Sequence, residues 1–281
     1  MSRPPLLARL HSTLAALTDS EQKVAMAVRR DPQATVYASV TELAAAAGVG
    51  ETTVLRFARK LGFQSYQAFK IELARDIFSE GSGETSHAGQ PDKPDLLRRA
   101  TENNQKVIVD TYRLLDRRTF TKAVEFLAAA REIHFYGVGH SGITAQDASR
   151  SFWRMGLPAR AFLDAHFQLM DASRLTSLDA AVGLSVSGST RDTIECLDVA
   201  RSRGAHTIAI TGYAQAPIAR VADVVLVTAT REMPLQAGSF TSKIGQLHML
   251  DLLLRAVVQA RPEAALKYQE ETGRAISRRL Y

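Results

Sequence analysis

A run of small, polar and charged residues divides this chain into two parts with different hydrophobic patterns. Residues 79–95, SEGSGETSHAGQPDKPD, contain glycine, serine, proline and charge but no large apolar side chain to bury. Before this run every periodic segment has helical spacing, and no segment alternates as a strand would. We therefore predict a helical domain at residues 1–78, a flexible linker at 79–95 and a second domain at 96–281.

The second part combines helical segments with short apolar runs. These runs are EIHFYGVG, PARAFLD, DAAVGLSVS, AHTIAITG and DVVLVTAT, and helical segments separate most of them. Short apolar runs that alternate with helices are typical of parallel strands buried on both faces. The predicted fold class is an all-α domain followed by an α/β domain with a doubly wound, mostly five-stranded parallel sheet.

Composition limits the classes of partner and compartment. A length of 281 residues suits two domains. The formal charge of +6 and the pI of about 9.6 favour a polyanionic partner. The single Cys196 cannot form an intramolecular disulfide, and its helical context indicates a small core residue in a reducing compartment. No apolar run approaches the ~18 residues of a membrane span, and no signal peptide is recognised, so we expect a cytoplasmic protein without a membrane partner.

The helical part contains a helix-turn-helix pattern. Ser39 and Glu42 match a capping box, in which a hydroxyl and a carboxylate bond exposed N–H groups at a helix start. The helix that begins there ends at Gly48, and a second helix is expected over residues 51–61. Two short helices joined by a glycine-containing turn predict a helix-turn-helix.

The second of these helices has one apolar face and one polar face. Val54, Phe57, Ala58 and Leu61 share the first, whereas Thr53, Arg56 and Lys60 share the second. A helix in this position enters the DNA major groove, where arginine pairs with guanine and other cations contact phosphates. A plain solvated face of a helical bundle is the alternative. The predicted DNA-binding residues are Thr52, Thr53, Arg56, Arg59, Lys60 and Lys70.

The segment SVTELAAAAGVGETTVLRFARKLGFQSYQAFK, residues 39–70, closely resembles the DNA-binding domain of the RpiR family of bacterial transcription regulators. The resemblance covers about the first 77 residues. It departs from the family at Gly50, where a serine usually caps the second helix. Glycine is a tolerated cap that costs only a few tenths of a kcal/mol, so the resemblance still implies DNA binding.

Two loops of the α/β part carry small and hydroxylated residues between a strand and a helix. FYGVGHSG, residues 135–142, contains the G-x-G-x-x-G spacing that also binds dinucleotides. A dehydrogenase would use Asp164 for the ribose, but no separate catalytic domain follows the sheet, and Asp164 then serves as a helix cap or loop residue. The second loop, LSVSGSTRDT, suits a phosphate monoester and sugar hydroxyls better than a dinucleotide.

Residues 120–254 resemble the SIS, or sugar isomerase, domain of RpiR regulators. Its signatures are GVGHS, residues 137–141, and SVSGST, residues 185–190, and GSFTSKIGQLHMLDLL is similar to its last helix. The resemblance implies a phosphosugar site in which serine and threonine supply hydroxyls and glycine permits close backbone approach. The implied site residues are Gly139, Ser141, Ser185, Ser187, Gly188, Thr190 and Ser242.

Together these features predict a transcriptional regulator of sugar metabolism that binds operator DNA and responds to a phosphorylated sugar or sugar acid. We expect no enzyme activity, no cofactor and no metal. The alternative is a phosphosugar isomerase, which needs a positioned base such as Glu232, His166 or His248. A helix-turn-helix reads two half-sites as a dimer, so we expect a homodimer or homotetramer, formed through helices 96–115 and 245–258.

Overall fold

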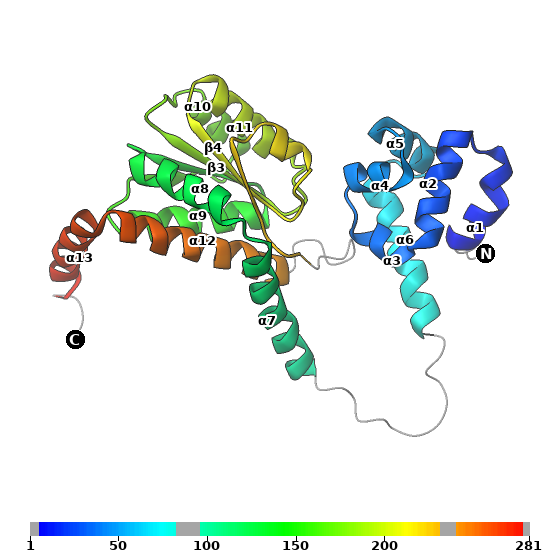
Figure 1. Cartoon of the computed structure of the whole chain (residues 1–281), viewed down its shortest axis with the longest axis horizontal. Coiled ribbons are helices and arrows are strands. Elements are labelled where there is room, and N and C mark those ends of the chain that lie inside the picture. Colours follow the sequence, from blue (N-terminus) through cyan, green and yellow to red (C-terminus); the bar gives the residue numbers. More distant parts are fainter. Residues whose placement is uncertain (1–5, 83–95, 231–239, 278–281) are drawn as a thin grey trace. The chain divides into compact units, whose positions relative to one another are not determined.

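The computed structural model describes residues 6–82, 96–230 and 240–277. Its described residues form two compact units (Figure 1). The division falls between Arg99 and Ala100, in the first turn of the helix at Leu96–Leu114, which is described with the second unit. Each unit is considered by itself. None of the described helices is long and apolar enough to span a membrane.

The first unit is helical, as predicted. Ser39 and Glu42 exchange the two bonds of the capping box at the start of α4, at 2.8 and 3.1 Å. Gly48 ends α4 in the left-handed conformation, with φ of 63°. Helix α6 extends to Ser82, four residues into the expected linker, and residues 83–95 lie outside the described part. The helices are α1 (Leu6–Thr13), α2 (Asp19–Arg30), α3 (Pro32–Tyr37), α4 (Val40–Ala47), α5 (Glu51–Lys60) and α6 (Tyr66–Ser82), with a 3-10 turn at Leu14–Ala16.

The second unit is α/β, and its five strands are all parallel in the order β2-β1-β3-β4-β5, which confirms the predicted fold class. The strands are β1 (Ile133–Tyr136), β2 (Ala159–Ala161), β3 (Ala180–Ser185), β4 (His206–Thr211) and β5 (Val224–Val227). The helices are α7 (Leu96–Leu114), α8 (Arg117–Ala129), α9 (His140–Trp153), α10 (Ala165–Ala172), α11 (Arg191–Ser202), α12 (Phe240–Ala260) and α13 (Pro262–Ser277), with a 3-10 turn at Pro217–Arg220.

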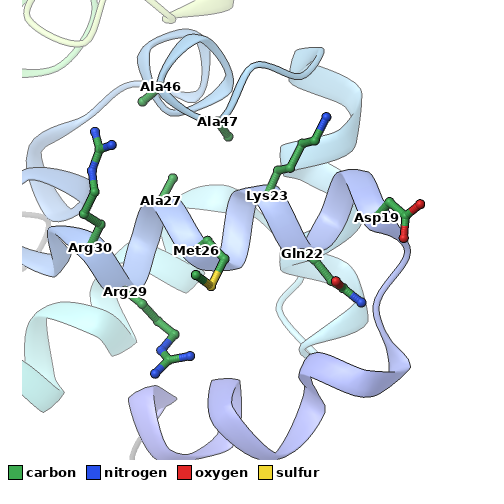
Figure 2. Close-up of a pocket in the computed structure, with 9 residues that line it drawn as sticks. All are labelled: Asp19, Gln22, Lys23, Met26, Ala27, Arg29, Arg30, Ala46 and Ala47. Atoms are coloured by element: carbon green, nitrogen blue, oxygen red, sulfur yellow. The ribbon is translucent and has the colours of Figure 1, made fainter.

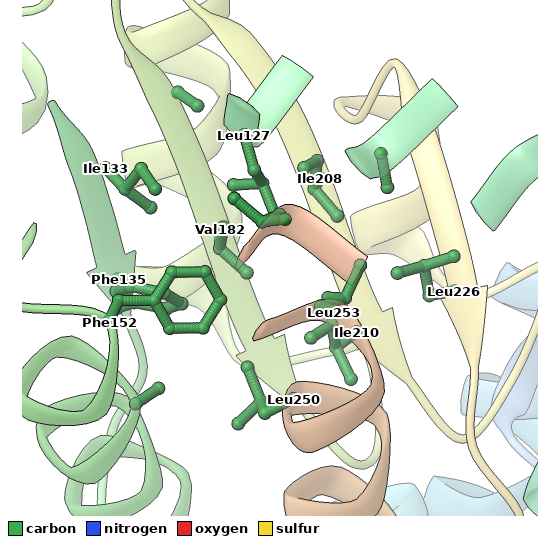
Figure 3. Close-up of a cluster of buried hydrophobic side chains, with 14 of the residues drawn as sticks. Leu127, Ile133, Phe135, Phe152, Val182, Ile208, Ile210, Leu226, Leu250 and Leu253 are labelled. Carbon is green, nitrogen blue, oxygen red and sulfur yellow. The ribbon is translucent and has the colours of Figure 1, made fainter. Parts of the chain in front are cut away.

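Alternate residues of each strand point to opposite sides of the sheet, and helices cover both sides, so each face carries a buried cluster. On one face, Phe135 and Val182 pack with Leu127 of α8, Phe152 of α9 and Leu253 of α12 (Figure 3). The other face carries α10, α11 and the 3-10 turn, with a cluster that includes Tyr136, Ala181, Ala209, Ala172, Leu197 and Ile218.

This topology creates a switch point between the neighbouring strands β1 and β3. The chain leaves β1 for α9 on one face and leaves β3 for α11 on the other. The two connecting loops therefore diverge at the carboxyl edge of the sheet. In open α/β sheets, ligands bind at such a point.

Candidate functional site

The loop after β1 forms a tight turn that exposes the start of α9. A Cβ on Gly137 would lie 2.8 Å from the carbonyl oxygen of Ser141, so only glycine fits there. Gly139 precedes α9 with φ of 59°, and apart from its two chain neighbours no described residue has an atom within 4 Å of the place its Cβ would take. No described side chain caps α9, and its first turn contains no acidic residue. The first N–H groups of a helix left uncapped in this way attract an anion.

The loop after β3 brings its hydroxyl groups together. The Ser185 side chain is buried, and its Oγ lies 2.9 Å from Oγ1 of Thr190. Ser187 is exposed. Thr190 precedes α11 but makes no cap bond to it among the described residues, so this helix start also presents free N–H groups.

Gly188 has a second role that the sequence does not show. Its φ is 61°, and an added Cβ would press on Ala216 and lie 2.7 Å from Oγ1 of Thr211. The carbonyl of Gly188 also accepts a bond from Ile218 N–H at 2.9 Å. Packing of the loop against the 3-10 turn therefore explains this glycine without a ligand.

The first turns of α12 approach the same edge of the sheet. Ser242 is buried, with its Oγ 3.0 Å from Oγ1 of Thr230. The buried Gln246 donates a hydrogen bond to Ser141 at 3.3 Å, so α12 contacts the loop after β1 directly. Sequence reasoning missed Gln246, although a glutamine one helical turn after Ser242 on a largely apolar helix was a usable signal.

Gln168 on α10 is the other residue that sequence reasoning missed. Its side chain is buried, donates to the carbonyl of Gly137 at 2.8 Å and accepts from the N–H of the same residue at 3.2 Å. The only signal in the sequence was a glutamine between the apolar residues Phe167 and Leu169 of this helix. The structure thus shows that two buried side-chain amides, those of Gln168 and Gln246, contact the loop after β1.

The structure also places residues that a dehydrogenase or an isomerase would use. Asp164 accepts a bond from Phe167 N–H at 3.0 Å and caps α10, as the non-dehydrogenase interpretation predicts. His140 and His166 are exposed, His248 is half-buried on α12, and Glu232 lies outside the described residues. Within the described part of the chain, no cluster of histidine, cysteine and acidic side chains suits a metal ion.

Cys196 lies on α11 and packs in the core cluster between this helix and the sheet. Burial, aided by the charges of Glu195 and Asp192, raises the pKa of its thiol to about 12. At neutral pH the thiol is protonated, which makes it a poor nucleophile. This environment fits the predicted role as a small core residue.

One residue of the predicted polar face of α5, Thr53, is not exposed. Thr52, Arg56 and Arg59 are exposed, whereas Thr53 is buried with Val54 against the core. Of the two predicted threonines, Thr52 is therefore on the exposed face of α5 and Thr53 is not. Arg56 and Arg59 are exposed, as a contact with bases or phosphates requires.

Two predicted phosphate-binding lysines take part in the fold of the helical unit. Lys60 forms an ion pair with Glu21 at 2.9 Å. The N–H of Thr18 and the side chain of Lys60 lower the pKa of the Glu21 carboxyl. Lys70 donates to the carbonyl of Ala38 at 3.1 Å, and its ammonium lies 5.2 Å from the centre of the Tyr66 ring.

A second cationic region lies on the exposed side of α2. A hollow there is lined by the cations Lys23, Arg29 and Arg30 and one acid, Asp19, together with Gln22, Met26 and Ala27 and with Ala46 and Ala47 of α4 (Figure 2). The opposite side of α2 carries Val24 and Val28, which pack in the shared core. The arginines of this hollow belong to α2 and not to α5, so they offer matched controls for DNA binding by α5.

Comparisons with known proteins agree with both units. A family model described as a helix-turn-helix domain of the rpiR family matches residues 5–80, and a SIS domain model matches residues 126–256. An uncharacterized HTH-type transcriptional regulator of Caldanaerobacter subterraneus is 34% identical and covers 98% of both chains. The HTH-type transcriptional regulator HexR of Pseudomonas aeruginosa is 35% identical over 91% of this chain and 90% of its own.

A solved structure extends the similarity over both units. The Vibrio vulnificus NanR protein complexed with ManNAc-6P has a TM-score of 0.87 and 27% sequence identity, and the match covers 98% of this chain and 99% of that chain.

Proposed function

The chain belongs to the RpiR family of helix-turn-helix transcriptional regulators with a SIS domain, and we propose that a phosphorylated sugar or sugar acid controls its binding to operator DNA. One observation carries the effector half of this proposal: the uncapped starts of α9 and α11 diverge at the switch point of the sheet, beside clustered hydroxyl groups. Free N–H groups and hydroxyls together suit a phosphate and a sugar.

For DNA, we propose that α5 enters the major groove. Arg56 is proposed to contact a base, Thr52 a base edge, and Arg59 a phosphate. We propose that Thr53, Lys60 and Lys70 support the fold of this unit and do not contact bases, because each already packs or bonds within the unit. Lys60 and Lys70 still add positive charge near the DNA backbone.

Gel-shift titration tests this face. Arg56→Ala should weaken operator binding by about 1 to 3 kcal/mol and relax the preference at one base position. Arg30→Ala removes the same charge from the α2 hollow and should leave the preference unchanged. Equal losses for the two variants would contradict the assignment of α5 as the reading helix.

For the effector, we propose that the N–H groups after Gly139 and the hydroxyls of Ser141, Ser187 and Thr190 receive the phosphate. Ser185 and Ser242 are buried and bonded to other hydroxyls, so they orient the site from behind. Gly188 holds the second loop in place for this contact. The sugar phosphate bound to the related NanR protein supports this class of ligand.

A thermal-shift screen of phosphorylated sugars should identify the effector, since a ligand that binds the folded state raises its stability. Ser187→Ala should then weaken binding by about 1.5 to 3 kcal/mol, the range for a hydrogen bond to a charged group. Ser202→Ala, at the other end of α11, is the control and should bind as the parent does. The parent and both variants should bind operator alike without effector.

We propose that the α/β unit senses the sugar phosphate without converting it. The helix-turn-helix domain joined to this unit supports sensing, whereas an isomerase would need a base positioned at the substrate carbon. Incubation of the parent with aldose and ketose phosphates, followed by chromatography, should show no interconversion. Turnover that Ser187→Ala abolishes would establish the isomerase alternative.

A two-fold dimer is proposed because the two half-sites of an operator need two reading helices. Helix α7 supports this, since Ile108, Val109 and Tyr112 are exposed on it. Helix α12 offers less surface, because Leu250, Leu253 and Val257 are buried within its own unit. Sedimentation should show a dimer or tetramer at micromolar concentration, and Tyr112→Glu should favour the monomer.

A further inference from the structure

The side chain of Gln168 makes three hydrogen bonds to the main chain around the loop after β1. Its Nε2 donates to the carbonyl of Gly137 at 2.8 Å and to the carbonyl of Phe162 at 2.9 Å, and its Oε1 accepts from Gly137 N–H at 3.2 Å. Two carbonyls require donors and one N–H requires an acceptor, so the partners fix which end of the amide is nitrogen.

These bonds act at the first residue of the proposed effector loop. Gly137 directly follows β1, and the loop folds so closely over it that a Cβ there would meet Ser141. Because Gln168 bonds both the N–H and the carbonyl of Gly137, it fixes the orientation of the main chain at the point where the loop begins. The free N–H groups at the start of α9 follow from that orientation.

Helix α10 has a second, independent connection to β1. Asp171, one turn after Gln168, accepts from the Tyr136 hydroxyl at 2.9 Å and lies 2.6 Å from Nδ1 of the buried His134. Burial, and then the Asp171 charge, raises the pKa of Tyr136, so the phenol remains a donor. Asp171 therefore keeps α10 on the strand even when Gln168 is replaced, and the bonds of Gln168 are left to position the loop.

We propose that Gln168 is a positioning residue, which holds the loop after β1 in the conformation that receives the effector's phosphate. This inference rests on the proposed function of that loop. Gln168 itself does not contact the effector: it is fully buried, both donors of its amide are used within the protein, and its acceptor is bonded to Gly137. A loop fixed before binding loses less conformational freedom when the ligand arrives, and this raises affinity.

Gln168→Met tests the proposal, because methionine keeps the length of the side chain and removes all three bonds. Thr207→Val is the matched control: Thr207 is also fully buried, and it bonds Asp223 and Val221 at the opposite end of the sheet. The probes are ManNAc-6P, glucose 6-phosphate and fructose 6-phosphate, and the one that binds the parent best is used for calorimetry.

We expect Gln168→Met to raise the Kd about tenfold or more, with operator binding in the absence of ligand unchanged. Thr207→Val should lower the melting temperature without raising the Kd. Hydrogen exchange of the amides at residues 137–142 should be faster in Gln168→Met and unchanged in Thr207→Val. An unchanged Kd, or unchanged exchange in this loop, would overturn the positioning role.

If Gln168→Met does not fold, Gln168→Glu replaces it. A carboxylate has no donor for the carbonyls of Gly137 and Phe162, whereas its protonated form has one. The Kd of this variant relative to the parent should therefore be larger at about pH 8 than at about pH 5, and a ratio independent of pH would overturn the proposal. If the parent binds none of these probes and no phosphorylated sugar of the thermal-shift screen, the proposed function fails, and the exchange measurement still decides whether Gln168 holds the loop.

Discussion

Gly188→Ala should destabilise the α/β unit because of crowding at the loop after β3. An alanine at this position must adopt φ of 61°, which is left-handed. Its Cβ would also press on Ala216 and lie 2.7 Å from Oγ1 of Thr211 and 3.2 Å from Cγ2 of Ile218. Thr211 belongs to β4, Ile218 to the 3-10 turn, and Ala216 directly precedes that turn; all three are buried, so they cannot move aside freely.

The magnitude follows from two contributions. A left-handed conformation costs a residue with a Cβ about 1 to 2 kcal/mol. Forcing an extra carbon into a packed region costs about 1 to 3 kcal/mol more. The free energy of unfolding should therefore fall by about 2 to 5 kcal/mol in Gly188→Ala.

Gly204→Ala separates these contributions within the same unit. Gly204 also has a left-handed φ, 86°, but its Cβ would have room, with Cβ of Ser177 the nearest atom at 3.6 Å. Only the conformational contribution of about 1 to 2 kcal/mol is expected there. The difference between the two variants measures the crowding at Gly188.

Urea unfolding followed by tryptophan fluorescence gives both values. Trp153 is the only tryptophan of the chain and lies on α9, so the signal reports the α/β unit. Its ring packs edge to face with Tyr268, with centroids 5.9 Å apart, and unfolding disrupts this contact. Equal losses in Gly188→Ala and Gly204→Ala would refute the packing argument and leave ligand approach as the reason for a glycine at this position.

Three further predictions concern single side chains. Thr111→Val should cost about 1 to 3 kcal/mol in the same urea assay, because it leaves the N–H of Ala229, now bonded to Thr111 at 3.0 Å, without its acceptor; an unchanged midpoint would contradict this. The folded pKa of Glu21 lies below its ordinary value of 4.5, so its stabilisation is present above that pH and is lost as the pH falls through the folded pKa. Circular dichroism melts should thus show Glu21→Gln less stable than the parent at about pH 7, with a difference that shrinks towards about pH 3; a constant difference would be inconsistent with the ion pair. Cys196 should react with a neutral thiol reagent at pH 7 only on unfolding, since its pKa is raised to about 12, and fast labelling of the folded protein would disprove its burial.

The patterns that could be read from the sequence were local ones. Capping residues such as Ser39 and Glu42 act within one turn of a helix, so the helix-turn-helix was predicted from neighbours in the sequence. The parallel sheet was predicted because strands covered on both faces must be apolar throughout, as the fully buried β3 shows. Resemblance to a family added the ligand class, which the local patterns left open.

The rotation of α5 could not be predicted from spacing alone. Thr53 follows Thr52, and both are equally compatible with an exposed or a buried position, because threonine has a methyl group and a hydroxyl. The packing of α5 buries Thr53 beside Val54, Phe57 and Ala58. The neighbouring helices decide where the apolar face of α5 ends, and the periodicity of one helix carries no information about its neighbours.

The contacts behind the two loops were hidden for a different reason. Gln168 bonds main-chain atoms of Gly137, thirty-one residues earlier, and any residue type presents the same main-chain groups. Gln246 likewise meets a side chain 105 residues away, that of Ser141. No spacing rule connects such partners, because only the tertiary fold brings them together.

Helix α12 shows what such contacts imply for regulation. Gln246 bonds Ser141 of the proposed effector loop, while the adjacent Gly245 packs against α7, where its Cβ would lie 3.3 Å from Val107 and 3.5 Å from Thr111. Thr111 in turn bonds the main chain that follows β5. Gly245 and Gln246 are consecutive residues of one helix, so a displacement of Ser141 would be passed through them to α7, the helix that follows the predicted linker in the chain.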